Sequence, residues 1–313
     1  MVSAEGSGAI IITPHSPYGR DLYAQSINVD WKRLWGDQGI QINVEGAHFY
    51  WAINDTDGGI IIGHGDNIER LDALGNIIWT MKGFNAWAIY RAVSNGSGGA
   101  LLLLYINGSG YLQNISSEGI LLWGKDGVYV GEIEKRNYSN GDINYELDMV
   151  GDGYGGAIIV WQEKLTETEK IYAQRVSNDG ETLWGNNGIP VSIAIVDQKS
   201  PKMTSDGNGI FIVIWTSISK TPPFYDSNIY AQKLNNNGQL LWSKQGVPVI
   251  DDSKFIPQPT RLTYQSRPQL SADGSGGAII AWYENRRTPD DDQFAQRVNA
   301  SGEILWNRGG VSL

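Results

Sequence analysis

The sequence predicts an all-β fold, a six-bladed β-propeller with four antiparallel strands in each blade. Two observations predict it: a motif of glutamine, tryptophan and glycine that recurs six times, and a glycine-rich turn with an apolar run before each copy. In every copy the tryptophan follows the glutamine position by ten residues, and a glycine follows the tryptophan by four. The mean repeat length, 313/6 or about 52 residues, is in the range of one propeller blade.

The strands are predicted from the order of these signals within a repeat. A short alternating segment forms the first strand, and the apolar run after the glycine-rich turn, as in residues 157–161, forms a second strand buried on both faces. The alternating segment at residues 171–176 forms the third strand, and residues 181–184 begin the fourth. Gly180 supplies the positive φ of the turn between them. The first repeat has Trp31 at that position, so we expect its turn to differ.

The recurrent tryptophan is predicted to fill the wedge between neighbouring blades, because a large ring that recurs in every blade suits a packing role. Ligand platforms are the alternative. The six residues are Trp35, Trp79, Trp123, Trp184, Trp242 and Trp306.

We expect one domain over residues 1–313, with each blade made from contiguous sequence. The approximate blade limits are 1–44, 45–89, 90–145, 146–199, 200–265 and 266–313. In an up-and-down blade the turns from first to second and from third to fourth strand share one end, called here the turn end. The remaining connections share the opposite end, called the loop end. The turn-end spacings are uniform and the loop-end spacings vary, so ligand binding is expected at the loop end.

The combined pattern, with residues 152–161 before residues 171–189, resembles a repeat found in exported bacterial and archaeal β-propeller proteins, mostly of unassigned function. The resemblance covers nearly the whole chain. It implies a propeller and an extracellular or cell-surface location. It implies no particular activity.

Composition limits the partners. The net charge is −10 with no basic run, which argues against nucleic acid, and the apolar runs are too short to span a bilayer. The start of the chain has no signal-peptide pattern, so the protein is either cytosolic or a mature or trimmed form of an exported one, and the resemblance favours the exported form. We expect a monomer without a cofactor.

The main functional hypothesis is a non-catalytic propeller that binds a protein or carbohydrate ligand through its loop end. Aromatic and cationic residues of the loops suit such an interface. The candidates are Tyr18, Arg20, Arg136, Tyr138, Tyr225, Arg261, Tyr264 and Arg286. One alternative is a lectin with pockets at blade junctions. The other is a glycoside hydrolase or lyase with acids at the mouth of the channel, for which the candidates are Glu45, Glu146 and Asp148.

Two further hypotheses concern charged side chains. His15, His48 and His64 are predicted near the loop end of the first two blades, where they could bind zinc, with scattered surface histidines as the alternative. Arg175 and Arg297 are expected to pair with glutamates at the ends of the preceding strands. The two glutamates are Glu163 and Glu284.

Overall fold

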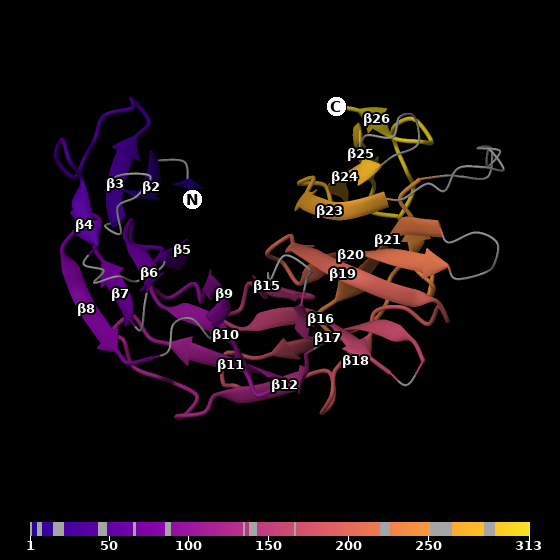
Figure 1. Ribbon diagram of the computed structural model, residues 1–313, viewed down its shortest axis with the longest axis horizontal. Helices are drawn as coiled ribbons and strands as arrows, with labels where there is room; N and C mark the ends of the chain where they lie inside the picture. Colours follow the sequence, from indigo (N-terminus) through magenta and orange to yellow (C-terminus); the bar gives the residue numbers. More distant parts are fainter. Residues whose placement is uncertain are drawn as a thin grey trace. The chain divides into compact units, whose positions relative to one another are not determined.

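The chain is all-β in the computed structural model (Figure 1). The structure describes residues 2–4, 8–14, 22–42, 49–64, 67–84, 89–133, 135–137, 143–165, 167–219, 226–250, 265–284 and 292–313. The chain forms two compact units, Met1–Tyr129 and Val130–Leu313. Each unit is described by itself.

Six four-stranded antiparallel sheets account for nearly all of the strands, as the repeat predicted. Sheets 1 to 3 contain β1 (Val2–Ala4), β2 (Gly8–Pro14), β3 (Leu22–Asn28) and β4 (Ile40–Ile42); β5 (Phe49–Asn54), β6 (Ile60–His64), β7 (Asn67–Leu71) and β8 (Ile77–Lys82); and β9 (Ile89–Ser94), β10 (Ala100–Ile106), β11 (Ser109–Ile115) and β12 (Val128–Glu132).

Sheets 4 to 6 follow the same order. They contain β15 (Leu147–Gly151), β16 (Ala157–Lys164), β17 (Glu169–Val176) and β18 (Ile189–Pro190); β19 (Asp197–Ser205), β20 (Ile210–Ser219), β21 (Asp226–Asn235) and β22 (Val247–Pro248); and β23 (Gln265–Ala272), β24 (Ala278–Glu284), β25 (Asp292–Val298) and β26 (Val311–Ser312). A two-stranded hairpin, β13 (Lys135–Asn137) with β14 (Ile143–Tyr145), lies between sheets 3 and 4 in sequence and was not predicted.

The repeated glutamine explains the constant ten-residue spacing. In sheet 4, Gln174 accepts the backbone N–H of Trp184 at 2.9 Å through Oε1, and its Nε2 donates to the carbonyl of Gly185. The same pair of bonds recurs in sheets 1, 3, 5 and 6, where the glutamines are Gln25, Gln113, Gln232 and Gln296. The glutamine side chain thus ties the backbone at the tryptophan to the third strand. Both hydrogen bonds require the same number of residues between glutamine and tryptophan, which explains the constant spacing.

The fourth strand does not begin where the sequence predicted. Residues 181–184 form only an isolated bridge, Val176 with Thr182, and the strand proper starts at Ile189. Gly185 follows the tryptophan with φ +80°. Positive φ is not required for the late start, because Ser243 and Asn307 hold this position in sheets 5 and 6 without it, and the fourth strand starts equally late there. Sheet 2 has Thr80 at this position, and there the tryptophan stays inside a continuous strand, β8.

The turn of the first repeat does not differ, contrary to expectation. Trp31 adopts φ +62° and its N–H donates to the carbonyl of Asn28 at 3.0 Å, just as Gly75 donates to Asp72 at 2.9 Å in sheet 2. The Asn28 side chain also accepts two backbone N–H groups of the turn. These bonds hold a conformation that a non-glycine residue rarely adopts.

The core consists of apolar clusters between consecutive sheets of a unit. Within the second unit, one cluster joins sheets 4 and 5 through residues such as Val160 and Val213. Another joins sheets 5 and 6 through Ile214 and Ile280. In sheets 2 to 5 the second strand is buried on both faces, as its continuous apolar run predicted. In sheet 6 the prediction is wrong, because burial alternates along β24 and Ile279 is 40% exposed.

Candidate functional site

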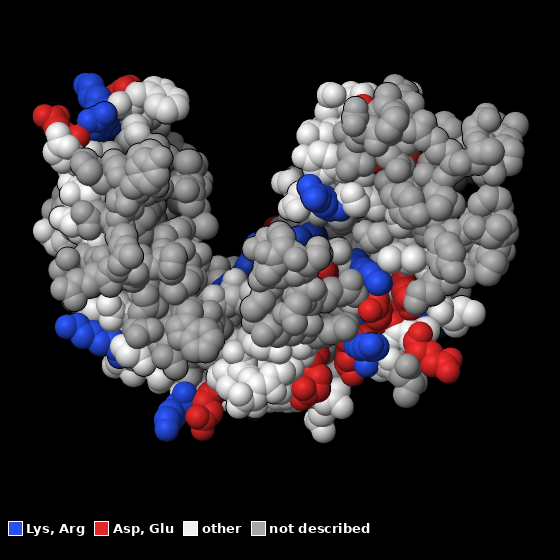
Figure 2. All heavy atoms as spheres, viewed as in Figure 1, with Lys and Arg blue, Asp and Glu red and all other residues white. Residues whose placement is uncertain are grey.

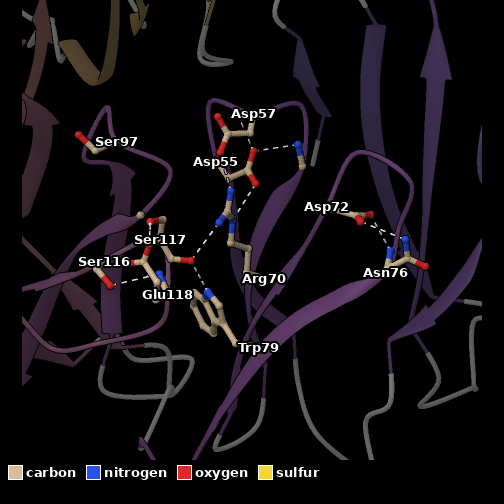
Figure 3. Close-up of polar contacts among 12 residues, drawn as sticks. Asp55, Asp57, Arg70, Asp72, Asn76, Trp79, Ser97, Ser116, Ser117 and Glu118 are labelled. Carbon is tan, nitrogen blue, oxygen red and sulfur yellow. Dashed lines mark hydrogen bonds and ion pairs between the residues drawn. The ribbon is translucent and has the colours of Figure 1, made fainter.

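The repeated side chains make joints between consecutive sheets at the turn end. Figure 3 shows the joint between sheets 2 and 3, where Arg70 pairs with Asp55 at 2.9 Å and with Asp57 at 2.7 Å. Arg70 also donates to the carbonyl of Ser117 at 2.9 Å, and the indole of Trp79 donates to the same oxygen at 2.8 Å. One carbonyl of the next sheet therefore accepts from both side chains.

The same joint recurs in the second unit. Arg175 and Trp184 of sheet 4 both donate to the carbonyl of Asn236, at 3.2 and 3.0 Å. In sheet 5, Lys233 and Trp242 both donate to the carbonyl of Ala300, at 3.2 and 3.1 Å. These tryptophans are buried, so they cannot serve as open ligand platforms.

The arginine partners are aspartates of the glycine-rich turns, not the predicted glutamates. Arg175 pairs with Asp152 at 2.8 Å, and Arg297 pairs with Asp273 at 2.8 Å. The expected pairs with Glu163 and Glu284 are wrong because those glutamates end the second strand at the loop end, whereas the arginines point to the turn end. Glu284 instead accepts the indole N–H of Trp282 at 2.8 Å.

A different set of polar groups gathers at the loop end of sheet 4. Glu163 of β16 lies opposite Lys170 of β17. On the same face of the sheet, two residues closer to the turn end, Trp161 lies opposite Tyr172. The rings of that second pair stack with centroids 6.1 Å apart. Trp161 is fully buried, whereas Glu163, Lys170 and Tyr172 are half-buried. The cluster therefore rests on a rigid base and reaches the surface.

These three side chains have displaced pKa values. Burial raises the pKa of Glu163 above its ordinary 4.5, and the nearby Glu132 carboxylate also raises it. Burial raises the pKa of Tyr172, with a further contribution from Glu163. Burial lowers the pKa of Lys170, which Asp197 partly offsets. Clustered pKa shifts on accessible groups are typical of functional sites.

The first strand of sheet 5 completes the cluster. Asp197 of β19 accepts the backbone N–H of Glu169 at 3.1 Å, and Gln198 accepts that of Ile171 at 3.1 Å. Lys199 forms an ion pair with the Glu169 carboxylate at 2.8 Å. The site thus spans two sheets, and its geometry depends on how β19 packs on β17.

Most of the binding residues predicted from the sequence lie outside the described part of the chain. These are Tyr18, Arg20, Tyr138, Tyr225, Arg261, Tyr264 and Arg286. Arg136 lies in β13, which pairs with β14, but its side chain is outside the description. Their grouping at one loop end stays a prediction.

The acids proposed for a channel mouth are not open to a substrate where they are described. Asp148 is 3% exposed and accepts the backbone N–H groups of Met149 and Met203, each at 3.0 Å. Glu146 is also buried. Asp148 therefore ties β15 to β19, while Glu45 lies outside the described residues.

His64 is fully buried, so it is no surface histidine. Its Nε2 lies 3.2 Å from Oε2 of Glu69, the residue that replaces glutamine in the second repeat. His15 and His48 lie outside the described residues. Within the described ranges, no group of three or more histidine, aspartate and glutamate side chains is placed to hold a metal ion.

Sequence reasoning missed Lys170, Asp197 and Lys199, and it assigned Glu163 to the wrong partner. The sequence does contain one indication of this cluster. The apolar run of the second strand ends in two polar residues, Gln162 and Glu163.

No helix in the described part of the chain is long and apolar enough to cross a membrane. Among the described residues on the visible face, Figure 2 shows acidic and basic side chains interspersed.

No protein-family model and no curated protein matches the sequence. A quinonprotein alcohol dehydrogenase-like protein from Bacteroides thetaiotaomicron is similar in structure, with 13% identity, a TM-score of 0.54, and coverage of 99% of this chain and 65% of its own. The GH74 xyloglucanase from Xanthomonas campestris is similar at 14% identity and a TM-score of 0.51, over 99% of this chain and 44% of its own. Both are propeller-like, and identities this low show the fold alone.

Proposed function

We propose that this chain is a six-bladed, extracellular or cell-surface propeller that binds a protein or glycan ligand at its loop end. The observation that carries the proposal is the difference between the polar side chains at the two ends of the sheets. The repeated arginine and tryptophan side chains are bonded into joints at the turn end. Glu163, Lys170 and Tyr172 are instead half-buried at the loop end of sheet 4, and of this cluster the aromatic stack recurs in sheets 5 and 6 whereas the pairing of Glu163 with Lys170 does not.

Closure of the six sheets into a ring is part of this proposal. Propeller-like neighbours that cover nearly the whole chain support it. The repetition of one joint also supports it, because equal joints between equal sheets generate a regular rotation from each sheet to the next.

The cluster suits recognition of a ligand that offers both donors and acceptors. A half-buried carboxyl with a raised pKa, a phenol and a lysine can bind hydroxyl, amide or carboxylate groups, and partial burial strengthens each bond. The neighbouring Glu169–Lys199 pair holds the surrounding side chains in place.

The test measures binding to a glycan array and to a random peptide library, with two matched variants. Tyr172→Phe removes one hydroxyl at the loop end and keeps the stack on Trp161, because sheet 6 already has the equivalent pair, Trp282 with Phe294, at 6.2 Å. Tyr154→Phe removes a hydroxyl from an exposed tyrosine at the turn end.

We expect Tyr172→Phe and Glu163→Gln to weaken binding of whatever ligand is selected, and Tyr154→Phe to leave it unchanged. Equal loss in both tyrosine variants, or a loss only in Tyr154→Phe, would place the site elsewhere.

A second candidate, glycoside hydrolysis, has one observation in its favour. The carboxyl of Glu163 keeps its proton to higher pH than usual and lies near Glu132, and glycoside hydrolases use two carboxyl groups, one of them as the proton donor. Release of reducing sugar from polysaccharides that is lost in Glu163→Gln would favour this candidate over simple binding.

A further inference from the structure

A short segment at the loop end of sheet 4 exposes two isoleucines. The segment, residues 191–196, connects β18 to β19. Ile193 is 53% exposed and Ile195 is 88% exposed, whereas Val191 and Ser192 of the same segment are buried. Neither isoleucine fills the core, and the two lie two residues apart, so together they offer an apolar contact surface.

Hydrogen bonds fix the segment against the rest of the second unit. The Ser192 hydroxyl donates to the carbonyl of Gln245 at 2.9 Å, and the N–H of Ile193 donates to that of Lys244 at 3.0 Å. Lys170 donates from Nζ to the carbonyls of Ala194 and Val196. The isoleucines are therefore presented in one conformation, which lowers the entropy lost when a partner binds.

One exposed lysine, Lys244, lies beside the segment, because its carbonyl accepts the N–H of Ile193. Asp197 is 4% exposed, and the Glu169 carboxylate is paired with Lys199. Lys244 is exposed and forms no ion pair with any described residue. In a chain of net charge −10, this exposed lysine is complementary to a partner that carries carboxylates.

We propose that residues 191–196 form a docking loop for a protein partner that presents a peptide segment of aliphatic side chains flanked by carboxylates. The inference rests on the proposed function and narrows its ligand to a protein. Ile193 and Ile195 supply the apolar anchors, as aliphatic side chains do at interface centres, and Lys244 meets the flanking carboxylates.

The experiment selects peptides from a random dodecamer library on the wild-type protein and measures the affinity of a synthetic consensus peptide by calorimetry. We expect selected peptides to combine aliphatic and acidic residues. The Ile193→Ser/Ile195→Ser variant should bind the consensus peptide about tenfold more weakly or worse. Lys244→Glu should weaken binding most at low salt, because the charge attraction is screened as salt rises.

Controls separate docking from folding and from the neighbouring cluster. Leu74→Ser removes a similarly exposed leucine, 77% exposed, from a turn of sheet 2 and should leave the affinity unchanged. The melting temperature of each variant should match the wild type, because the substituted side chains are exposed.

Several results would overturn the docking loop. Selection that yields no peptide above background would do so, as would peptides that bind the double isoleucine variant as tightly as the wild type. A glycan ligand that depends on Tyr172 but not on Ile195 would end the docking loop and leave the proposed function standing. A wild-type dimer that Ile195→Ser converts to a monomer would make the occupant a second copy of this chain.

Discussion

At the scale of single residues, Glu163 is the side chain whose environment most clearly works against its charge. Burial is the main cause of its raised pKa. A group of this kind favours the folded state most when it is protonated, below its unfolded pKa. That contribution is lost as the pH rises through the pKa of the folded state.

Glu163→Gln should therefore change stability in a pH-dependent way. Relative to the wild type, the free energy of unfolding of the variant should rise as the pH increases from below 4.5 through the folded pKa of Glu163, and then stay level. Urea denaturation at a series of pH values measures the difference. A difference that does not vary with pH would show that the carboxyl is not destabilised by burial.

The pKa of Asp273 is shifted in the opposite direction to that of Glu163. Burial raises its pKa, but the N–H groups of Ser275 and Gly277 and the guanidinium of Arg297 lower it by more, so the net pKa falls below 3.8. Its contribution is present above the unfolded pKa and is lost as the pH falls through the folded value.

Asp273→Asn should accordingly be less stable than the wild type at neutral pH. The two proteins should converge as the pH falls through the folded pKa of Asp273, because the wild-type carboxylate then becomes neutral. Thermal unfolding at pH 7 and in acid compares them. If the deficit of the variant persists unchanged in acid, the ion pair with Arg297 is not its cause.

At the scale of the element, the two hydrogen bonds of the repeated glutamine, called here the glutamine clasp, fix the outer part of sheets 1, 3, 4, 5 and 6. The sequence shows only a fixed spacing between glutamine and tryptophan. It does not show that the Gln174 side chain bonds the backbone of Trp184 and Gly185, because that depends on the three-dimensional path of the chain. The exact start of the fourth strand could not be predicted. It depends on the hydrogen bonds of the glutamine side chain, which hold Trp184 outside the ladder. Sheet 2 has Glu69 at the glutamine position, and there Trp79 stays inside β8.

Gln174→Ala should cost about 1–3 kcal/mol in the free energy of unfolding, because it leaves a backbone N–H and a carbonyl without their partner. Gln41→Ala, at an exposed position of β4, is the matched control and should be nearly neutral. Urea denaturation measures both. Equal effects in the two variants would mean that the clasp contributes nothing specific.

The joint between consecutive sheets, made by Arg175 and Trp184 in sheet 4, also stabilises the fold at this scale. Trp184 is 5% exposed, packs beside Phe211 of sheet 5 and donates to Asn236, so Trp184→Ala should cost about 3–5 kcal/mol. Tyr154→Ala, at a residue 57% exposed in a neighbouring turn, should cost far less. Melting temperatures of the two variants within a degree or two of each other would rule out this role for Trp184.

At the scale of the whole molecule, the repeat was enough to predict six antiparallel four-stranded sheets, because spacing and patterning are properties of the sequence itself. The loop-end cluster could not be predicted in the same way. Lys199 meets Glu169 only because β19 lies against β17, and no spacing within a repeat encodes a contact between one repeat and the next.

The proposed closure of the ring depends on contacts between the first and the last sheet. Gly75, Gly119, Gly238 and Gly302 each lie against the tryptophan of the preceding sheet, where a side chain would clash or press on the ring. Trp31 of sheet 1 holds the equivalent position and is 84% exposed, and Trp306 of sheet 6 is 37% exposed. If the ring closes, these two indoles meet at the seam in place of the usual glycine and tryptophan.

A double-mutant cycle of Trp31→Ala and Trp306→Ala tests closure most directly, with urea denaturation of both single variants and the double variant. The closed ring predicts a coupling energy of about 1 kcal/mol or more, because side chains in contact are not additive. Trp31→Ala with Trp184→Ala serves as the control pair and should be additive. Additive effects of Trp31 and Trp306, each small as expected for exposed side chains, would contradict the closed propeller.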